Sequence, residues 1–246
     1  MGMPITVDVV DSVRGGVVDA VFADLNLIDR TFSPFLETSA VSRINRGELA
    51  AADAGALVQQ VLDLCRLYEV DTDGYFTAWI GGRLDPSGLV KGWAIDRACS
   101  ILDQHGCRNY LVDAGGDVQT RGRNHDRQPW RVGIRHPIQR DRVARVVHPE
   151  GLAVATSGNY EKGEHIVNAR TGERANGLLS FTVVGQDILA CDVYATVGFA
   201  MGAEGLAFVD RKRGFGAYAI HHDLSATWNP GFEAIAGVPP ADEPPS

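Results

Sequence analysis

Six short strands predicted in close succession constrain the fold of this chain more than any other feature. Strands that follow one another through short turns usually pair antiparallel. We therefore expect mixed or antiparallel sheets flanked by helices. This order of elements is typical of the α+β class rather than of an alternating doubly wound sheet. The predicted strands cover residues 109–113, 117–120, 130–135, 143–148, 152–156 and 180–185.

The helices are predicted from apolar residues at helical spacing. In the first, Val17, Val21, Leu25 and Ile28 form one stripe, and Pro34 interrupts the chain shortly afterwards. A short helical turn is expected after Ser39, within a loop over 32–45. Further helices are predicted over 53–67 with Asp53 as N-cap, over 90–105, over 187–201 with Asp187 as N-cap, and over 203–211. Single strands are expected at 5–9 and 216–221.

The length of 246 residues fits one large domain or two intertwined lobes. We take residues 1–236 as a single domain and predict that the proline-rich tail, 237–246, is disordered. The four cysteines show no Cys-x-x-Cys spacing and lie in or beside apolar segments. They are therefore expected to be buried free thiols.

Charge and hydropathy exclude some function classes. A net charge of −8 with no basic run argues against nucleic acid as a partner. No apolar run has transmembrane length, and no basic and apolar leader opens the chain. We therefore expect no membrane anchor in this chain and a cytoplasmic location.

The predicted helix 187–201 carries two oxygen donors, Asp192 and Thr196, one turn apart on the same face. Oxygen donors suit a hard cation such as Mg²⁺. The alternative is structural: the Thr hydroxyl would bond back to a carbonyl, and the carboxylate would meet a nearby arginine.

Three other segments contain residues that could bind phosphate or move a proton. Asp85 and Lys91 flank a glycine-containing turn before a helix, whose backbone N–H groups can bind an anion. The Thr-Ser-Gly turn at 156–158 could donate hydrogen bonds to phosphate. His165 stands alone before Ile166, and its ordinary pKa near neutrality suits a general base. The structural alternatives are a turn-initiating Asp, a solvated Lys and a structural His.

These blocks occur in a definite order. They are LDPSGLVKGWAIDRA (84–98), LVDAGGDVQTRG (111–122), AVATSGNYEKGEHIVNARTG (153–172) and DILACDVYATVGFAMG (187–202). From about Met1 to about Ile220 the chain resembles the ApbE-type FAD:protein FMN transferases. In that family Asp-x-Gly-Gly-x-x-Lys-Gly, Gly-Gly-Asp, Thr-Ser-Gly-x-Tyr, His-Ile-x-x-x-Arg-Thr-Gly and Asp-x-x-x-Thr follow in this order.

The resemblance implies an ApbE-like architecture related to the T-fold, and a Mg²⁺-dependent enzyme with FAD as substrate. Such an enzyme transfers FMN to a Thr or Ser hydroxyl of an acceptor flavoprotein and releases AMP. The acceptor would carry an Asp-Gly-x-Thr-like segment. Two alternatives share the same site: an FAD diphosphatase, with water as nucleophile, and a non-catalytic FAD-binding protein.

The resemblance also assigns residues. Asp192, Thr196 and the backbone carbonyl of Gly88 would hold the metal. Lys91 would stabilise phosphate charge, and His165 would be the general base. The positions implied around FAD are Met1, Phe35, Tyr75, Phe76, Thr77, Asp85, Lys91, Ser157 and Ile166.

The chain departs from the family pattern in several places. Phe35 replaces a flavin-stacking Tyr, which keeps the aromatic face and loses the hydroxyl. Thr77 replaces an Asp, and the segment 74–84 is shorter than in the family. We expect the adenosine end of the site or the protein-substrate groove to be reduced there.

Overall fold

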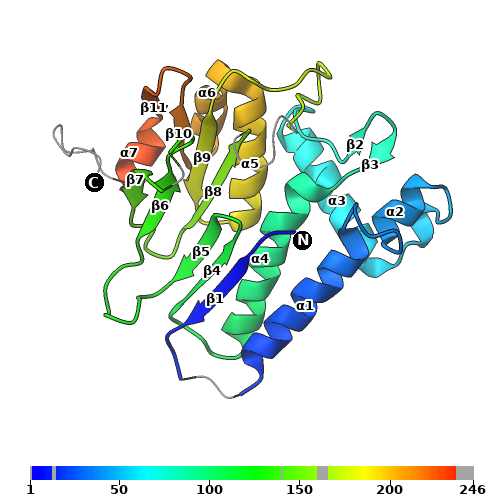
Figure 1. Ribbon diagram of the computed structural model, residues 1–246, viewed down its shortest axis with the longest axis horizontal. Helices are drawn as coiled ribbons and strands as arrows, with labels where there is room; N and C mark the ends of the chain where they lie inside the picture. Colours follow the sequence, from blue (N-terminus) through cyan, green and yellow to red (C-terminus); the bar gives the residue numbers. More distant parts are fainter. Residues whose placement is uncertain (1, 13–14, 140, 160–165, 237–246) are drawn as a thin grey trace.

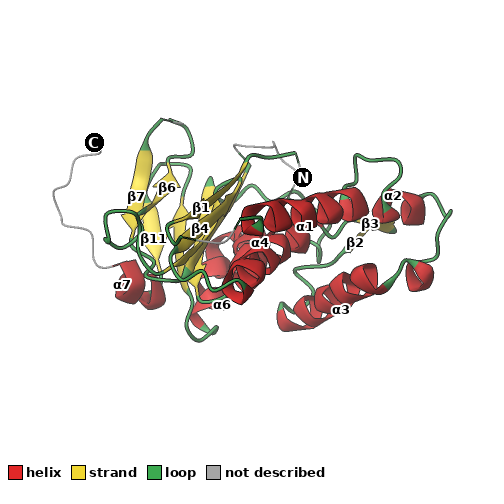
Figure 2. Ribbon diagram, turned by 90° about the horizontal axis from the view of Figure 1, so that it is seen from below, coloured by secondary structure: helices red, strands yellow, loops and turns green. Residues whose placement is uncertain are grey.

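The computed structural model describes residues 2–12, 15–139, 141–159 and 166–236. A seven-stranded sheet has one face covered by most of the helices, whereas a β-hairpin and the C-terminal helix pack against its other face. Figure 2 shows these layers edge on, with α1 and α4 beside the sheet and α3 further out. The α+β prediction is therefore confirmed.

Every neighbouring pair in the large sheet is antiparallel, including pairs that helices or other strands separate in the sequence. The hairpin of β6 (Val132–Arg135) and β7 (Val143–Val147) forms a separate sheet. In spatial order the large sheet contains β1 (Ile5–Val9), β4 (Tyr110–Ala114), β5 (Asp117–Arg121), β8 (Ala153–Gly158), β9 (Ser180–Gly185), β10 (Gly216–Ile220) and β11 (Ala226–Trp228).

The helices follow the predicted apolar spacing, with one error in placement. The predicted stripe on α1 is buried, and the side chain of Asp187 caps α5 by accepting the N–H groups of Leu189 and Ala190. Asp53 is not the N-cap of α3, because it lies in a 3₁₀ turn and α3 begins after Gly55. The helices are α1 (Val17–Phe32), α2 (Ala40–Asn45), α3 (Ala56–Asp71), α4 (Ser87–Gln104), α5 (Ile188–Met201), α6 (Gly205–Asp210) and α7 (Pro230–Ala236).

Helices α4 and α5 lie against each other and form the centre of the main core. Helix α5 is apolar almost all round, as expected of a helix enclosed by sheet and helices. A methyl group on Gly92 of α4 would lie 2.9 Å from the Cα of Leu189, so this glycine permits the close approach. The four cysteines are buried free thiols, as predicted.

Two segments contain short elements that the sequence analysis did not predict. Within 74–84, β2 (Trp79–Ile80) and β3 (Arg83–Leu84) form a short hairpin. The side-chain amide of Asn45 holds it by bonding both the N–H and the carbonyl of Leu84. The chain also continues past the last predicted strand into β11 and α7.

No described helix is long and apolar enough to cross a membrane. The proline-rich tail at 237–246 lies outside the described residues.

Candidate active site

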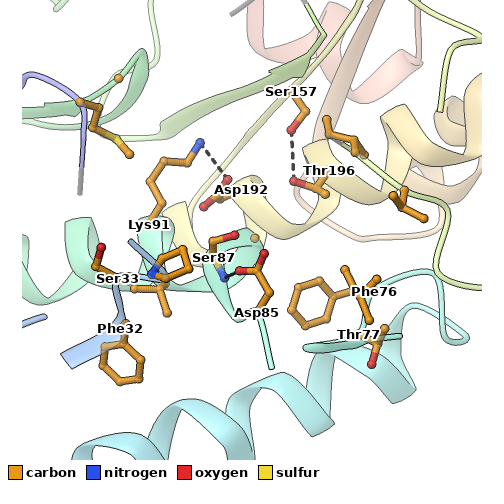
Figure 3. Close-up of a pocket in the computed structure, with 18 of the residues that line it drawn as sticks. Phe32, Ser33, Phe76, Thr77, Asp85, Ser87, Lys91, Ser157, Asp192 and Thr196 are labelled. Atoms are coloured by element: carbon orange, nitrogen blue, oxygen red, sulfur yellow. Dashed lines mark hydrogen bonds and ion pairs between the residues drawn. The ribbon is translucent and has the colours of Figure 1, made fainter. Parts of the chain in front are cut away.

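A cavity of about 480 Å³ opens where the C-terminal end of α1 and the N-terminal end of α4 meet α5 and the sheet. Lys91 and Asp192 lie at its polar end, and Phe32 and Phe76 lie toward the other, more apolar end, on either side of Asp85 (Figure 3). Its lining includes all of the described residues that the sequence predicted for the site: Phe35, Tyr75, Phe76, Thr77, Asp85, Gly88, Lys91, Ser157, Ile166, Asp192 and Thr196.

The polar end is built around the Lys91 ammonium, which lies between two carboxylates. Its Nζ is 2.5 Å from Asp117 Oδ2 and 3.2 Å from Asp192 Oδ1. Both Asp side chains are almost fully buried, at 1% and 2% exposed, whereas Lys91 is 22% exposed. Lys91 is therefore the partly accessible member of a buried charge cluster.

Burial and charge act in opposite directions on these groups. Burial alone would lower the pKa of Lys91, but the carboxylates of Asp117 and Asp192 outweigh it and raise the pKa well above its ordinary value. Burial raises the pKa of Asp192, and the Lys91 charge opposes that rise. Lys91 is therefore charged at neutral pH.

The helix α5 presents Asp192 and Thr196 to the cavity, but with different partners from those of the structural alternative. Asp192 Oδ2 accepts the N–H of Gly92 at 2.8 Å, and its other oxygen meets a lysine rather than an arginine. The hydroxyl of Thr196 lies 3.1 Å from that of Ser157, at the end of β8. The predicted turn at 156–158 therefore meets the helix at the polar end of the cavity.

The donor set fits a hard cation. Among the described residues, no group of three or more His, Cys, Asp or Glu side chains could hold a metal ion. A cation here would instead be held by Asp192, the Thr196 hydroxyl and the Gly88 carbonyl, together with oxygens of a bound ligand. Such all-oxygen coordination with few carboxylates is typical of Mg²⁺ on phosphate substrates.

The Asp85 turn serves the start of α4. Asp85 Oδ1 accepts the N–H of Ser87 at 3.1 Å, and its own N–H donates to the carbonyl of Ala78 at 2.8 Å. The turn-initiating role is therefore present in the structure, and Asp85 still lines the cavity (Figure 3).

Aromatic and aliphatic side chains form the other end of the cavity. Phe32 and Phe76 are buried, and Phe32 packs edge-on against Trp93. The guanidinium of Arg170 lies 4.9 Å from the ring centre of Tyr75. Phe35, in contrast, is 90% exposed at the mouth, so its ring is open to a ligand.

Two predicted residues lie outside the described part of the chain, Met1 and His165. One residue of the polar end was missed as such. Gly115-Gly116-Asp117 fits either a hairpin turn or a segment near the flavin from the sequence alone, and neither interpretation gives Asp117 a partner. In the structure Asp117 pairs with Lys91 and also accepts the N–H of Thr156 at 3.0 Å. A carboxylate directly after two glycines was the available signal. Gly115 and Gly116 both have positive φ, at 63° and 94°, as a tight hairpin requires.

The chain is similar in sequence and in fold to known proteins. The ApbE family matches residues 1–84 and 81–219, and the break falls at the end of the shortened segment 74–84. An FAD:protein FMN transferase of Vibrio cholerae is 33% identical over 53% of this chain and 42% of its own length. One of Escherichia coli K12 is 31% identical over 62% of this chain and 47% of its own length.

The chain thus aligns with less than half the length of these curated relatives. The solved flavin transferase ApbE from Vibrio cholerae superposes with a TM-score of 0.81, at 20% identity, over 96% of both chains. This likeness confirms the fold. Because the family match covers most of the sequence, this chain belongs to the ApbE family.

Proposed function

We propose that the protein transfers FMN from FAD to a Thr or Ser hydroxyl of an acceptor flavoprotein, with Mg²⁺. The acceptor oxygen forms a bond to the phosphorus of the FMN moiety. The bond from that phosphorus to the bridging oxygen of the diphosphate breaks, and AMP leaves with this oxygen. The hydroxyl proton passes to a base, and FMN remains in a phosphoester linkage.

The observation that carries the proposal is the division of the cavity into two ends. A planar flavin needs apolar and aromatic walls, which Phe32, Phe76 and Ile166 provide. A diphosphate needs cations and donors, which Lys91 and the hydroxyl groups provide. FAD combines both requirements in one molecule.

Each polar group has a separate task. Asp192, Thr196 and the Gly88 carbonyl would hold Mg²⁺, which when bound neutralises phosphate charge. Lys91 would stabilise the charge that develops on the phosphate, because its own charge is fixed by the two carboxylates. His165 would take the proton from the acceptor hydroxyl.

The remaining predicted residues would contact FAD from the apolar end. Phe35 would stack on the flavin, which agrees with its open ring at the mouth. Tyr75, Thr77 and Asp85 line the adjoining wall, beside the short hairpin of β2 and β3. The acceptor would present an Asp-Gly-x-Thr-like segment.

An assay of AMP tests the proposal against its two alternatives. The protein is incubated with FAD and Mg²⁺, with and without an acceptor carrying an Asp-Gly-x-Thr segment. Acceptor-dependent AMP supports the transferase, acceptor-independent AMP an FAD diphosphatase, and retained FAD without AMP a binding protein.

Asp192→Ala tests the metal site. We expect AMP release to fall at least about a hundredfold, because without this carboxylate the Mg²⁺ that would neutralise the developing phosphate charge is no longer held. Asp63→Ala, on the exposed face of α3, is the matched control and should leave the rate unchanged. Circular dichroism checks that both variants fold. Unchanged turnover in Asp192→Ala contradicts the metal assignment.

A further inference from the structure

We propose that Asp117 is a positioning residue that keeps Lys91 from competing with the divalent cation for Asp192. Without a metal, the Lys91 ammonium acts as the internal counter-ion of Asp192. When a cation binds Asp192, Asp117 retains the ammonium. The inference rests on the proposed function only in placing the cation at Asp192.

The distances define the two partners of Lys91. The contact with Asp117 is the shorter, at 2.5 Å, and that with Asp192 is 3.2 Å. Asp192 uses its other oxygen to accept the Gly92 N–H, so Lys91 occupies the oxygen that is not committed to the backbone. A divalent cation on Asp192 therefore meets a positive charge already beside that oxygen.

Asp117 is anchored independently of Lys91. Its Oδ1 accepts the backbone N–H of Thr156, and the residue begins β5, directly after the glycine turn. It is 1% exposed. A carboxylate so buried is costly without a cation partner, which makes Asp117 a strong and fixed site for the ammonium. Asp192 can then exchange one cation for another while Lys91 stays paired.

The lysine resonances give a direct readout. The chain has three lysines, Lys91, Lys162 and Lys212, so a protein labelled with ¹³C at lysine Cε yields three signals. Lys212 pairs with Asp71 at 2.7 Å and is an internal control. The Lys212→Arg and Lys91→Met variants assign the signals.

The labelled protein is titrated with Mg²⁺, first alone and then with ADP, a diphosphate without a flavin. We expect the Lys91 signal to move with saturation while the Lys212 signal does not. Calorimetry measures Mg²⁺ binding to the unmodified protein and to Asp192→Asn. If Mg²⁺ binds, and Asp192→Asn removes that binding, but the Lys91 signal does not move, the inference is overturned. Mg²⁺ binding that is absent, or that Asp192→Asn leaves unchanged, contradicts the proposed metal site itself.

A double-mutant cycle tests the role of Asp117. Asp117→Asn should weaken Mg²⁺ binding roughly tenfold, because Lys91 then depends on Asp192 alone. In the Lys91→Met background the same change should have little effect, since no ammonium remains to compete. Equal weakening in both backgrounds overturns the inference, because Asp117 would then act on the cation directly.

Asp117→Glu is the conservative variant and should recover part of the affinity. Circular dichroism checks the fold of each variant. Should Asp117→Asn fail to fold, the Mg²⁺ titration of the labelled, unmodified protein still tests the inference. A Lys91 signal that moves with saturation supports it, and an unmoved one overturns it.

Discussion

Two glycines one turn apart on α4 meet different surroundings, and substituting each by alanine separates their roles. A methyl group on Gly92 would lie 2.9 Å from the Cβ of Asp192 and from the carbonyl of Ile188. We expect Gly92→Ala to lower the free energy of unfolding by about 1–3 kcal/mol, as overpacking does. It should also weaken Mg²⁺ binding, because the N–H bonded to Asp192 moves.

Gly88→Ala is the matched control. Its methyl group would only touch the ring of Phe76, at 3.4 Å. The carbonyl proposed as a metal ligand is unchanged by the substitution, and alanine favours the helix by up to about 1 kcal/mol. Urea denaturation compares the stability of the two variants, and Mg²⁺ calorimetry compares Gly92→Ala with the unmodified protein. Equal losses in both would contradict the packing argument.

Site residues that are close together in the sequence could be placed relative to one another from the sequence alone. Asp192 and Thr196 are one helical turn apart, so their common face follows from helix geometry alone. The pairing of Asp117 with Lys91 could not be predicted, because β5 and α4 approach only after the sheet packs on the helix. Contacts between elements that are far apart in the chain produce no regular residue spacing from which they could be predicted.

At the scale of elements, one side-chain cluster joins α3, α5 and the turn after α6. Asp71 accepts the hydroxyl of Tyr194 at 2.7 Å and the ammonium of Lys212 at 2.7 Å. Burial alone would raise the pKa of Asp71, but these two bonds outweigh it and hold the pKa below its ordinary value.

This shift predicts how stability depends on pH. A carboxylate whose pKa is lower in the folded protein than in the unfolded chain stabilises the fold. This contribution is fully present above the unfolded pKa, about 4, and is lost as the pH falls through the folded pKa. Asp71→Asn should lower the free energy of unfolding by on the order of 0.5–1 kcal/mol at neutral pH. The difference should shrink below about pH 4.

Urea denaturation across this pH range measures the effect. Asp63→Asn, in an exposed pair with Arg66 on the same helix, is the control and should change stability little at any pH. A difference between Asp71→Asn and the unmodified protein that persists in acid would show that lost packing, rather than charge, causes it.

Elements with strong periodicity could be predicted, and weakly patterned ones could not. The stripe of α1 and the strands of the central sheet follow apolar spacing. The start of α3 was misplaced because Asp53 has a side chain suited to an N-cap. In the structure Asp53 ends a 3₁₀ turn, and α3 begins only after Gly55. Strand β11 was missed because three residues are too few for an alternating pattern.

For the whole molecule, the main core is continuous across the layers. It includes residues of α1 and α3 as well as of α4, α5 and the sheet. Helices and sheet that share one core are expected to unfold together. We therefore propose that residues 1–236 form a single domain, rather than two lobes that open separately.

The four cysteines can test this prediction. Cys65 lies on α3, Cys99 on α4 and Cys191 on α5, and Cys107 precedes β4. Burial raises the pKa of Cys65 and of Cys99 to about 12, so neither is a thiolate near neutral pH. We expect iodoacetamide at about pH 8 to modify the native protein at least about a thousandfold more slowly than the denatured protein.

The order in which the cysteines are modified in moderate urea then shows whether the protein unfolds as one cooperative domain or as two parts. In a cooperative domain, alkylation of all four cysteines should begin at the same urea concentration, as measured by mass spectrometry of the peptides. If the layer of α1 and α3 opened separately, Cys65 would react before Cys191. Because the core links these helices without interruption, we expect one common transition, and early reaction of Cys65 alone would contradict it.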